Sequence, residues 1–392
     1  MTPDETPAAR SSFEELARLG GIFLRLGMIS FGGPAGHIAM MEDELVRRRG
    51  WVTREKFLDL VGAVNLIPGP NSTELAFYLG LLRAGWAGFL VAGTAFILPA
   101  AILVAALAWA YVRYGMLPQA AALLYGTKPV IIAVVAQALW GLGRTAVRTK
   151  FLAALGIAVV VASFLGVNPV LLLFSAGAIV ALARLLLERP PSHLSLSSLL
   201  VGGAAALPTG AAGAAAGGVW SLFLYFLKVG AVLFGSGYLL IALLRADLVE
   251  RWHWLSEAQL LDAIAVSQVT PGPLSTAATF IGYLLAGPWG ALLATIGIFL
   301  PGFVIVGASG RLIPRVRQSR LAGAFLDGVN VAAVALMAAV SWQLGRAALV
   351  DIPTTAIAVA SGALLLRFRV NSAWLVLGGA LAGFAISVLR AP

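Results

Sequence analysis

The sequence predicts an all-α polytopic membrane protein built from two homologous halves, and three observations lead to this fold class. Hydrophobic residues make up 60% of the 392 positions, charged residues only 11%, and the mean hydropathy is +0.93, which excludes an ordinary soluble domain. Apolar runs such as 86–110, 129–142 and 151–187 are long enough to cross a bilayer. A proline-rich motif of the first half also returns 203 residues later.

This motif is Pro68-Gly69-Pro70, which returns as Pro271-Gly272-Pro273. A helix does not continue through it, because each proline lacks an amide donor and clashes with the preceding turn. In a membrane, irregular backbone survives only where protein or a water-filled cavity covers it. Each break is followed by polar residues that suit a helix N-cap, namely Asn71, Ser72 and Thr73, and then Ser275 and Thr276. Free amides at a helix N-terminus favour anions, so we expect both breaks to bind an oxyanion.

The 203-residue offset also relates many residues outside the motif. Matched pairs include Phe31-Gly32 with Phe234-Gly235, Trp51 with Trp254, Asp59 with Asp262 and Trp86 with Trp289. Chance does not produce such agreement, so it indicates an internal duplication, which is typical of transporters.

We expect four segments: a disordered tail (1–12), an N-terminal half (13–189), a linker (190–218) and a C-terminal half (219–392). Each half begins with an apolar helix, 13–30 or 219–233, that ends at a glycine-rich kink. A short helix with a capped start then leads to the break, and another follows it. Four longer apolar helices complete each half: 86–113, 118–142, 150–166 and 169–187, matched by 288–311, 320–345, 352–368 and 372–389. The alternative for 199–219 is a further membrane crossing.

The loop charges predict how the halves are inserted, because cytoplasmic loops carry an excess of Lys and Arg. Loop 47–56 carries five cations and loop 144–150 carries three, but in the second half the basic loop is 311–320, with four. Equivalent loops thus have opposite bias, which predicts an inverted repeat. The alternation is consistent only if 54–83 and 257–286 are re-entrant hairpins. We therefore expect about ten transmembrane helices, plus one Pro-Gly-Pro hairpin in each half.

Hinges are expected at the helix breaks, at Gly32, Gly33, Gly235 and Gly237 and at both Pro-Gly-Pro motifs. Arg25 and Lys228 are a matched pair of cations inside the first apolar helices. An intramembrane cation usually faces a cavity or a partner, so this pair is expected to complement a dianion; snorkelling or a structural ion pair is the alternative. Lys128 is a further cation in an apolar run, and its counterpart at the same offset is Val331.

Glu74 follows the first break by one turn, where the helix dipole favours a carboxylate. Beside an anion site it would repel the substrate unless protonated, which would suit proton coupling. Asp59 and Asp262 are expected to have structural roles near the interface, His37 to be a packing or interface residue, and Trp51 and Trp254 to be interfacial anchors.

Several functional classes lack their residues in this sequence. There is no cysteine, and the three histidines are scattered, so neither a metal site nor thiol chemistry is expected. No Walker A motif is present, which argues against ATP as the driving force. We expect no cofactor, and the net charge of +10, spread over short loops, indicates orientation in the membrane rather than nucleic-acid binding.

The sequence resembles the chromate ion transporter family in its long, two-domain form. The residues that carry the resemblance are Phe31-Gly32-Gly33-Pro34, Ile67 to Glu74, Thr270 to Pro273 and Phe234 to Tyr238. The resemblance implies a multi-pass protein of the bacterial inner (plasma) membrane that exports chromate and confers resistance to it, with sulfate as the usual competitor. A homodimer is also compatible with this reading.

Two alternatives stay open. One is a carrier for uptake of sulfate or a related oxyanion. The other is a membrane enzyme acting on lipid phosphates, which would need a nucleophile beside a base, for example Ser72 or Ser275 next to a histidine. No histidine is near either serine in the sequence. Our expectation is a transporter rather than an enzyme.

Overall fold

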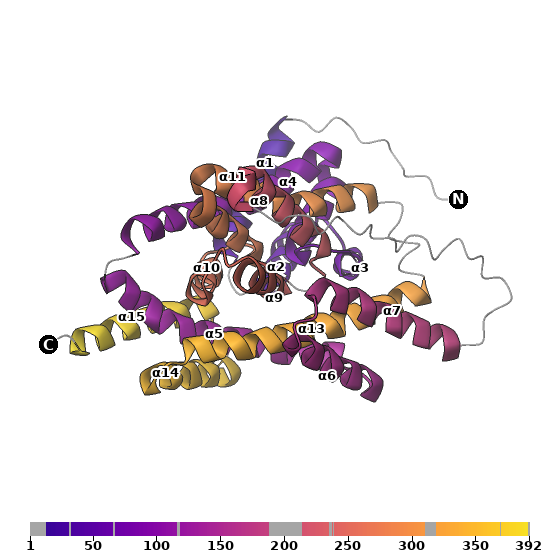
Figure 1. Cartoon of the computed structure of the whole chain (residues 1–392). Helices are drawn as coiled ribbons and strands as arrows, with labels where there is room; N and C mark the ends of the chain where they lie inside the picture. The colour runs from indigo at the N-terminus through magenta and orange to yellow at the C-terminus, as the bar shows by residue number, and fades with distance from the viewer. Residues whose placement is uncertain are drawn as a thin grey trace, which may run out of the picture.

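The computed structural model describes residues 13–30, 33–65, 67–115, 118–187, 214–234, 237, 239–309, 319–368 and 370–390 (Figure 1). These residues form helices joined by short connections, with no strand among them. The all-α prediction is therefore confirmed for the described part of the chain. The expected tail, most of the expected linker, Gly32, Gly235 and the basic stretch 311–318 lie outside the described residues.

The helices of the first half are α1 (Phe13–Ile29), α2 (Gly33–Met41), η1 (Glu42–Arg48), α3 (Arg54–Val64), α4 (Asn71–Tyr114), α5 (Pro118–Ala146), α6 (Lys150–Phe164) and α7 (Pro169–Leu187). Those of the second half are α8 (Ala214–Val232), α9 (Leu239–Leu244), η3 (Arg245–Arg251), α10 (Glu257–Val269), η4 (Leu274–Thr276), α11 (Ala277–Ser309), α13 (Arg320–Ala348), α14 (Ile352–Ala363), η5 (Leu364–Phe368) and α15 (Ser372–Arg390). Corresponding elements follow in the same order.

Local signals set the same boundaries in both halves. The π-helical segments η1 and η3 begin 203 residues apart, as do α3 and α10. Both capped starts are confirmed: Thr53 accepts a hydrogen bond from the Lys56 amide at 3.3 Å, and Ser256 accepts one from the Gln259 amide at 3.2 Å. These caps satisfy amides that the first helical turn cannot satisfy itself.

The repeat loses one residue inside α4 and α11, which corrects two expected pairings. Each helix contains a kink, at Ala84 and Gly85 in α4 and at Ala286 and Gly287 in α11, so the offset here is 202 residues. Trp86 therefore corresponds to Pro288 and not to Trp289. The offset of 202 continues into α5 and α13, which begin at Pro118 and Arg320. Lys128 thus corresponds to Asn330 and not to Val331.

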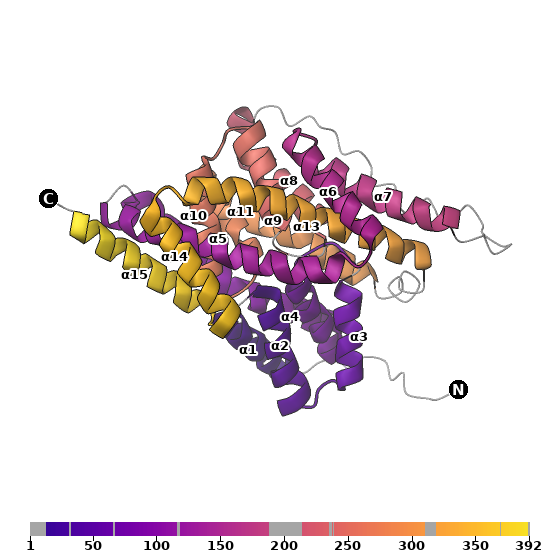
Figure 2. The ribbon, with the colours of Figure 1, turned by 90° about the horizontal axis from the view of Figure 1, so that it is seen from below.

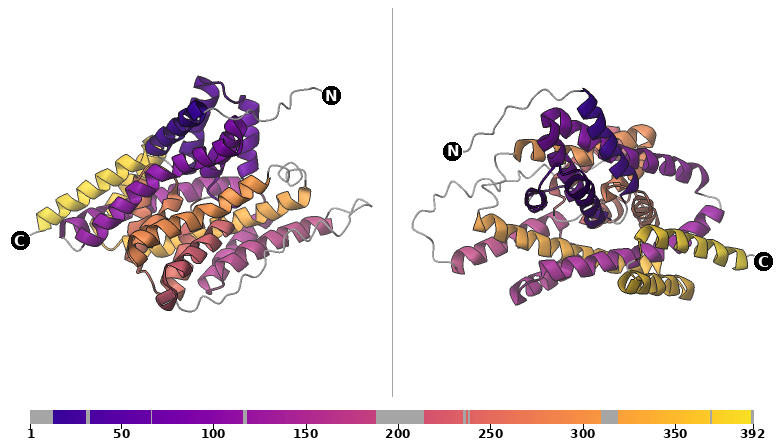
Figure 3. Two further views of the ribbon diagram at one scale, coloured as in Figure 1. Left: turned by 90° about the horizontal axis from the view of Figure 1, so that it is seen from above. Right: turned by 180° about the vertical axis from the view of Figure 1, so that it is seen from behind.

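The helices are arranged in two layers that exchange partners between the halves (Figure 1). Helices α1, α4, α8 and α11 pack together in one layer, and α5, α6, α7, α13, α14 and α15 form the other. In the second layer α5 of the first half packs against α14 and α15, as the view from below in Figure 2 shows, and α13 of the second half packs against α6 and α7. The view from behind in Figure 3 shows the same two layers. Each half thus packs helices of its second layer against the other half.

Glycines permit the closest of these exchanged contacts. A Cβ on Gly126 of α5 would collide with the main chain of Gly379 and Gly383 of α15, and one on Gly328 of α13 would collide with the main chain of Ala176 of α7. Gly126 and Gly328 are 202 residues apart, so the same contact is made twice. Small residues allow helix backbones to approach closely inside a membrane, where packing replaces the hydrophobic effect.

Six described helices are long and apolar enough to cross a membrane: Asn71–Tyr114, Ala121–Ala146, Pro169–Leu187, Leu274–Ala308, Arg320–Ala348 and Ser372–Leu389. Three shorter apolar helices accompany them, namely Lys150–Phe164, Gly218–Val232 and Ile352–Phe368. The prediction of a polytopic membrane protein is confirmed. The number of ten crossings stays a prediction.

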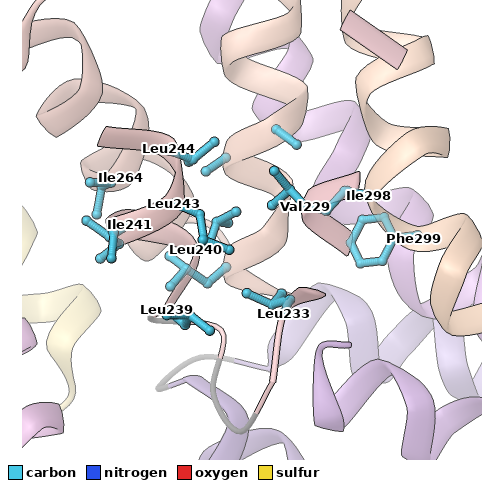
Figure 4. Packing of buried hydrophobic residues seen from close by; sticks show 14 of the residues in the cluster. Val229, Leu233, Leu239, Leu240, Ile241, Leu243, Leu244, Ile264, Ile298 and Phe299 are labelled. Atoms are coloured by element: carbon cyan, nitrogen blue, oxygen red, sulfur yellow. The ribbon is translucent and has the colours of Figure 1, made fainter. Parts of the chain in front are cut away.

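Buried apolar side chains hold the short helices between the two layers. Figure 4 shows Val229, Leu233, Leu240, Ile264 and Phe299 among the side chains gathered where α8, α9, α10 and α11 meet. Leu233 and Leu240 are fully buried. This part of the core fixes the end of α8, which the first Pro-Gly-Pro break contacts.

Candidate substrate site

Each Pro-Gly-Pro break is fastened to the opposite half by a main-chain hydrogen bond. The Gly69 amide donates to the carbonyl oxygen of Leu233 at 2.6 Å, and the Gly272 amide donates to that of Ser30 at 2.8 Å. Ser30 and Leu233 directly follow α1 and α8 and are themselves 203 residues apart. The two breaks therefore occupy equivalent places, each at the end of the first helix of the other half.

Both central glycines need the conformations that only glycine adopts easily. The φ angle is +140° at Gly69 and +104° at Gly272. A Cβ on Gly69 would collide with the Glu74 carboxyl group, and one on Gly272 would lie 2.6 Å from the Ala100 side chain. The break predicted at each motif is confirmed, because the helices on either side end and restart around these glycines.

The other predicted hinge residues flank these contacts. Gly33 is the first residue of α2 and has a φ of +73°. Gly237 is buried, and a Cβ added to it would lie 3.7 Å from the Leu274 side chain, next to the second break.

At the first break, α4 begins with four buried polar residues: Asn71, Ser72, Thr73 and Glu74. The Asn71 side-chain amide donates to Asn65 Oδ1 at 2.5 Å. The Thr73 and Glu74 amides both donate to the Pro70 carbonyl, at 2.7 and 3.2 Å. Among the described residues no main-chain acceptor bonds the amides of Asn71 and Ser72, which lie in the first helical turn.

Ser72 has a partner that sequence reasoning missed. Its Oγ lies 3.1 Å from His37 Nδ1 of α2, and the His37 ring also packs edge-on against Phe96. His37 is 1% exposed, so the contact with Ser72 is enclosed by protein. His37 packs inside the protein, as expected. Its contact with Ser72 at the break was not predicted, because 35 residues separate the two in the sequence.

The second break has fewer polar groups. Leu274 stands in place of Asn71, and Ala277 in place of Glu74. Thr276 bonds back to the Pro273 carbonyl through its amide at 3.0 Å and its hydroxyl at 2.9 Å. Ser275 Oγ is buried and has no hydrogen-bond partner among the described residues. It is the free hydroxyl of this break.

Glu74 lies at the contact between the halves. Its carboxyl group covers Gly69, and Oε1 would be 3.6 Å from a Cβ on Gly302 of α11. Glu74 is fully buried, and neither carboxyl oxygen has a hydrogen-bond partner in the described part of the chain. A buried carboxyl group without a hydrogen-bond partner is costly, and burial favours its neutral form.

The structure does not bring Arg25 and Lys228 to the breaks. Arg25 is exposed on α1 and lines a surface pocket of about 480 Å³ together with Arg18, Glu44, Arg48, Arg49 and Trp51. Lys228 Nζ lies 3.4 Å from Asp247 Oδ2 in its own half, which corresponds to the structural ion pair that the sequence left open. Their expected contact with the dianion therefore stays a prediction without geometric support.

A buried ion pair elsewhere was not foreseen. Lys128 Nζ of α5 lies 3.1 Å from Asp262 Oδ1 of α10, and the Tyr111 hydroxyl of α4 donates to Asp262 Oδ2 at 3.0 Å. We call these three residues the Lys128–Asp262 cluster. Asp262 is only 3% exposed, whereas the matched Asp59 is exposed, and the ion pair of Asp262 agrees with its expected structural role. Sequence alone showed a cation in an apolar run but not its partner 134 positions away.

A cavity of about 310 Å³ lies beside the first break, and we call it the Asn65 cavity. Polar and charged residues among those that line it are Asn65, Thr145, Arg148, Asp327 and Asn330. Because Asn65 is also bonded to Asn71, the cavity is connected to the start of α4. No group of three or more His, Asp or Glu side chains that could hold a metal ion occurs in the described residues.

Comparisons with known proteins agree with the repeat. A sequence model of the family described as chromate transporter matches residues 17–182 and again residues 220–384. The chromate transport protein of Cupriavidus metallidurans is 33% identical over 388 residues, which is 96% of each chain. The probable chromate transport protein of Synechococcus elongatus is 34% identical, covering 86% of this chain and 87% of that protein. The chromate transport protein of Pseudomonas aeruginosa is 31% identical, covering 93% and 91%. No solved structure matches significantly.

Proposed function

The chain belongs to the chromate transporter family, and from this premise we propose that it carries chromate, a tetrahedral dianion, out of the cytoplasm. It is a multi-pass bacterial membrane protein, and its relatives are named as transport proteins, not as enzymes. The observation that carries the proposal is the reciprocal bonding of Gly69 to Leu233 and of Gly272 to Ser30. It aims two helix N-termini at the contact between the halves.

Amides and hydroxyls at these N-termini are the proposed ligands. At the first break they are the amides of Asn71 and Ser72, the hydroxyl of Ser72, which also contacts His37, and the hydroxyl of Thr73, which has no partner among the described residues. At the second break they are the Ser275 hydroxyl and, once it has released the Pro273 carbonyl, the Thr276 hydroxyl. Donors in low dielectric suit a tetrahedral oxyanion, which offers four acceptor oxygens. The first break provides most of the ligands.

The proposed mechanism is alternating access. We propose that the halves form an inverted repeat of about five crossings each, with 54–83 and 257–286 as re-entrant hairpins. The exchanged contacts of α5 and α13 would let one unit rock against the other while the breaks stay at the centre. An inside-negative potential assists export of a dianion by about 2.3 kcal/mol per charge per 100 mV, so ATP is not required.

Glu74 is the proposed proton-coupling group. Its carboxyl group is buried beside the ligands without a partner in the described part, so we propose that it is protonated when the anion is bound. Loss of that proton would place a negative charge next to the anion and favour its release. The uptake of sulfate and a homodimeric assembly stay predictions on the same scaffold.

The enzyme alternative required a serine beside a histidine, and Ser72 and His37 do form such a pair. However, the relatives are named as transport proteins and not as enzymes. Both side chains are also buried. We therefore assign the pair to positioning Ser72 at the anion site.

The test is chromate flux in everted membrane vesicles, where export from the cell appears as uptake. Wild type should accumulate chromate, and excess sulfate should compete. The Ser72→Val/Ser275→Val variant should lose about tenfold or more of this flux, because a hydrogen bond to a charged group is worth about 1.5–3 kcal/mol. Arg54→Ala, at a side chain that is 73% exposed and paired with Glu42 on the surface, is the matched control and should be unchanged. Flux of sulfate without chromate would overturn the substrate, and uptake only into right-side-out vesicles would overturn the direction.

A further inference from the structure

The two ends of α5 have different surroundings, and the matched residues of the second half allow them to be compared. Near its C-terminal end, Thr145 and Arg148 line the Asn65 cavity. Nearer its N-terminal end, Lys128 belongs to the buried Lys128–Asp262 cluster. Lys128 and Thr145 are 17 positions apart, which is about 25 Å along a helix. The cavity therefore lies at the C-terminal end of α5, and the ion pair lies about 25 Å away toward its N-terminal end.

The Lys128–Asp262 cluster joins the halves tightly at its end. Tyr111 and Lys128 come from α4 and α5 of the first half, and Asp262 comes from α10 of the second. The Lys128 and Asp262 side chains are only 20% and 4% exposed. One carboxylate oxygen accepts a hydrogen bond from the phenol hydroxyl, and the other lies 3.1 Å from the ammonium group. Separation of a buried pair leaves uncompensated charges, so the pair resists separation of the halves at this point.

The residues that the repeat matches to Lys128 and Asp262 are an amide and a carboxylate, Asn330 and Asp59. At the offset of 202, Asn330 replaces Lys128, and the matched carboxylate, Asp59, is exposed on α3. An amide cannot supply the charge of an ammonium group. Asn330 lines the Asn65 cavity, together with Arg148 and Asp327. The Asn65 cavity is thus lined by Asn330, the residue that stands in place of Lys128 in the second half.

We propose that the Asn65 cavity is the vestibule through which a tetrahedral oxyanion reaches the first break, and that the Lys128–Asp262 cluster closes the opposite entrance. The inference rests on the proposed alternating-access function. Asn65 passes the anion from the cavity to Asn71, with which it shares a hydrogen bond. Arg148 provides a cation at the mouth, in the basic loop expected on the cytoplasmic side. In the other state Lys128 leaves Asp262 and faces the opposite vestibule.

The chain contains no cysteine, so a single introduced cysteine is the only thiol in the protein and reports on access at its own position. Val334→Cys places a thiol in the Asn65 cavity, and Ile132→Cys is its matched control at the offset of 202. Both positions are half-buried. The rate of labelling with a charged, membrane-impermeant thiol reagent is measured. Val334→Cys is labelled in everted vesicles, and Ile132→Cys is labelled in both everted and right-side-out vesicles. Sulfate serves as the protecting anion, because chromate itself oxidises thiols.

Val334→Cys should react about tenfold or more faster than Ile132→Cys, and sulfate should slow it. Adding Asp262→Asn should raise labelling of Ile132→Cys about tenfold or more from the opposite side, because loss of one buried ion pair shifts a two-state equilibrium. Asp262→Leu/Lys128→Met, which leaves no unpaired charge, should do the same and guards against misfolding of the single variant. Equal labelling of the two cysteines, or no response in either gate variant, would overturn the proposal. Labelling does not require chromate flux, so failure of the substrate assignment would leave this pattern intact.

Discussion

The two Pro-Gly-Pro breaks have the same backbone contacts but different side chains. Gly69 and Gly272 each bond to the end of the other half's first helix, at 2.6 and 2.8 Å. Beyond that, the first break has Asn71 and Glu74 where the second has Leu274 and Ala277. The repeat has thus kept the main-chain position and let the chemistry diverge. We infer that the backbone contact serves the movement of the halves, while anion and proton chemistry are concentrated at the first break.

The largest effect is expected from a side chain at either central glycine. Gly272→Ala should cost about 1–3 kcal/mol in backbone strain alone, with a further cost from the contact of 2.6 Å with Ala100. Ala100→Gly, which restores the residue found at the matched position Gly302, should recover the second part. Thermal stability of purified protein in detergent and chromate flux are the measurements.

Gly69→Ala should be equally damaging, and Glu74→Ala should relieve only its steric part, because the φ of +140° remains. If Gly69→Ala proves harmless while Gly272→Ala does not, the equivalence of the two breaks is wrong. A variant that is stable but inactive would instead locate the defect in movement of the halves.

The next prediction compares the carboxyl group at the first break with the alanine at the matched position of the second. Glu74→Gln should leave stability unchanged or raised, because it removes a buried carboxyl group that has no partner in the described part, and it should abolish the pH dependence of transport. Ala277→Glu, the reciprocal change at a position that is 1% exposed, should cost about 3 kcal/mol or more. Flux as a function of pH and thermal unfolding test both variants. A Glu74→Gln protein with an unchanged pH profile would remove Glu74 from the coupling scheme.

Features set by neighbouring residues could be predicted from the sequence. The breaks at Pro68 and Pro271 and the caps at Thr53 and Ser256 follow from residues within one or two turns, and the structure has all four. The division of the chain into two halves, with corresponding helices in the same order, followed from the repeat. These signals are local, so no knowledge of tertiary contacts was needed.

Features that depend on distant contacts could not be predicted in the same way. The pairing of Lys128 with Asp262 joins residues on helices of different halves. The loss of one residue before Gly287 also escaped notice, because both halves carry a tryptophan near the kink that aligns without a gap. Arg25 and Lys228 were expected to share a role because they match in sequence. Their surroundings differ, because Lys228 pairs with Asp247 whereas Arg25 lines a surface pocket.

The smallest effect concerns this last pair and sharpens the same lesson. Lys228→Ala leaves Asp247, which is 7% exposed, without its cation. The cost should be about 1–2 kcal/mol, less than for a fully buried pair, because the lysine side chain is 34% exposed and partly screened. Arg25→Ala, on the exposed side of α1, should stay within about 0.5 kcal/mol. Thermal unfolding of both variants and of Lys228→Ala/Asp247→Asn, which should recover part of the loss, measures the difference. If Arg25→Ala instead lowers chromate flux tenfold at unchanged stability, the surface pocket that it shares with Arg18 and Arg48 takes part in anion capture, and the first half then supplies both the cation and most of the ligands.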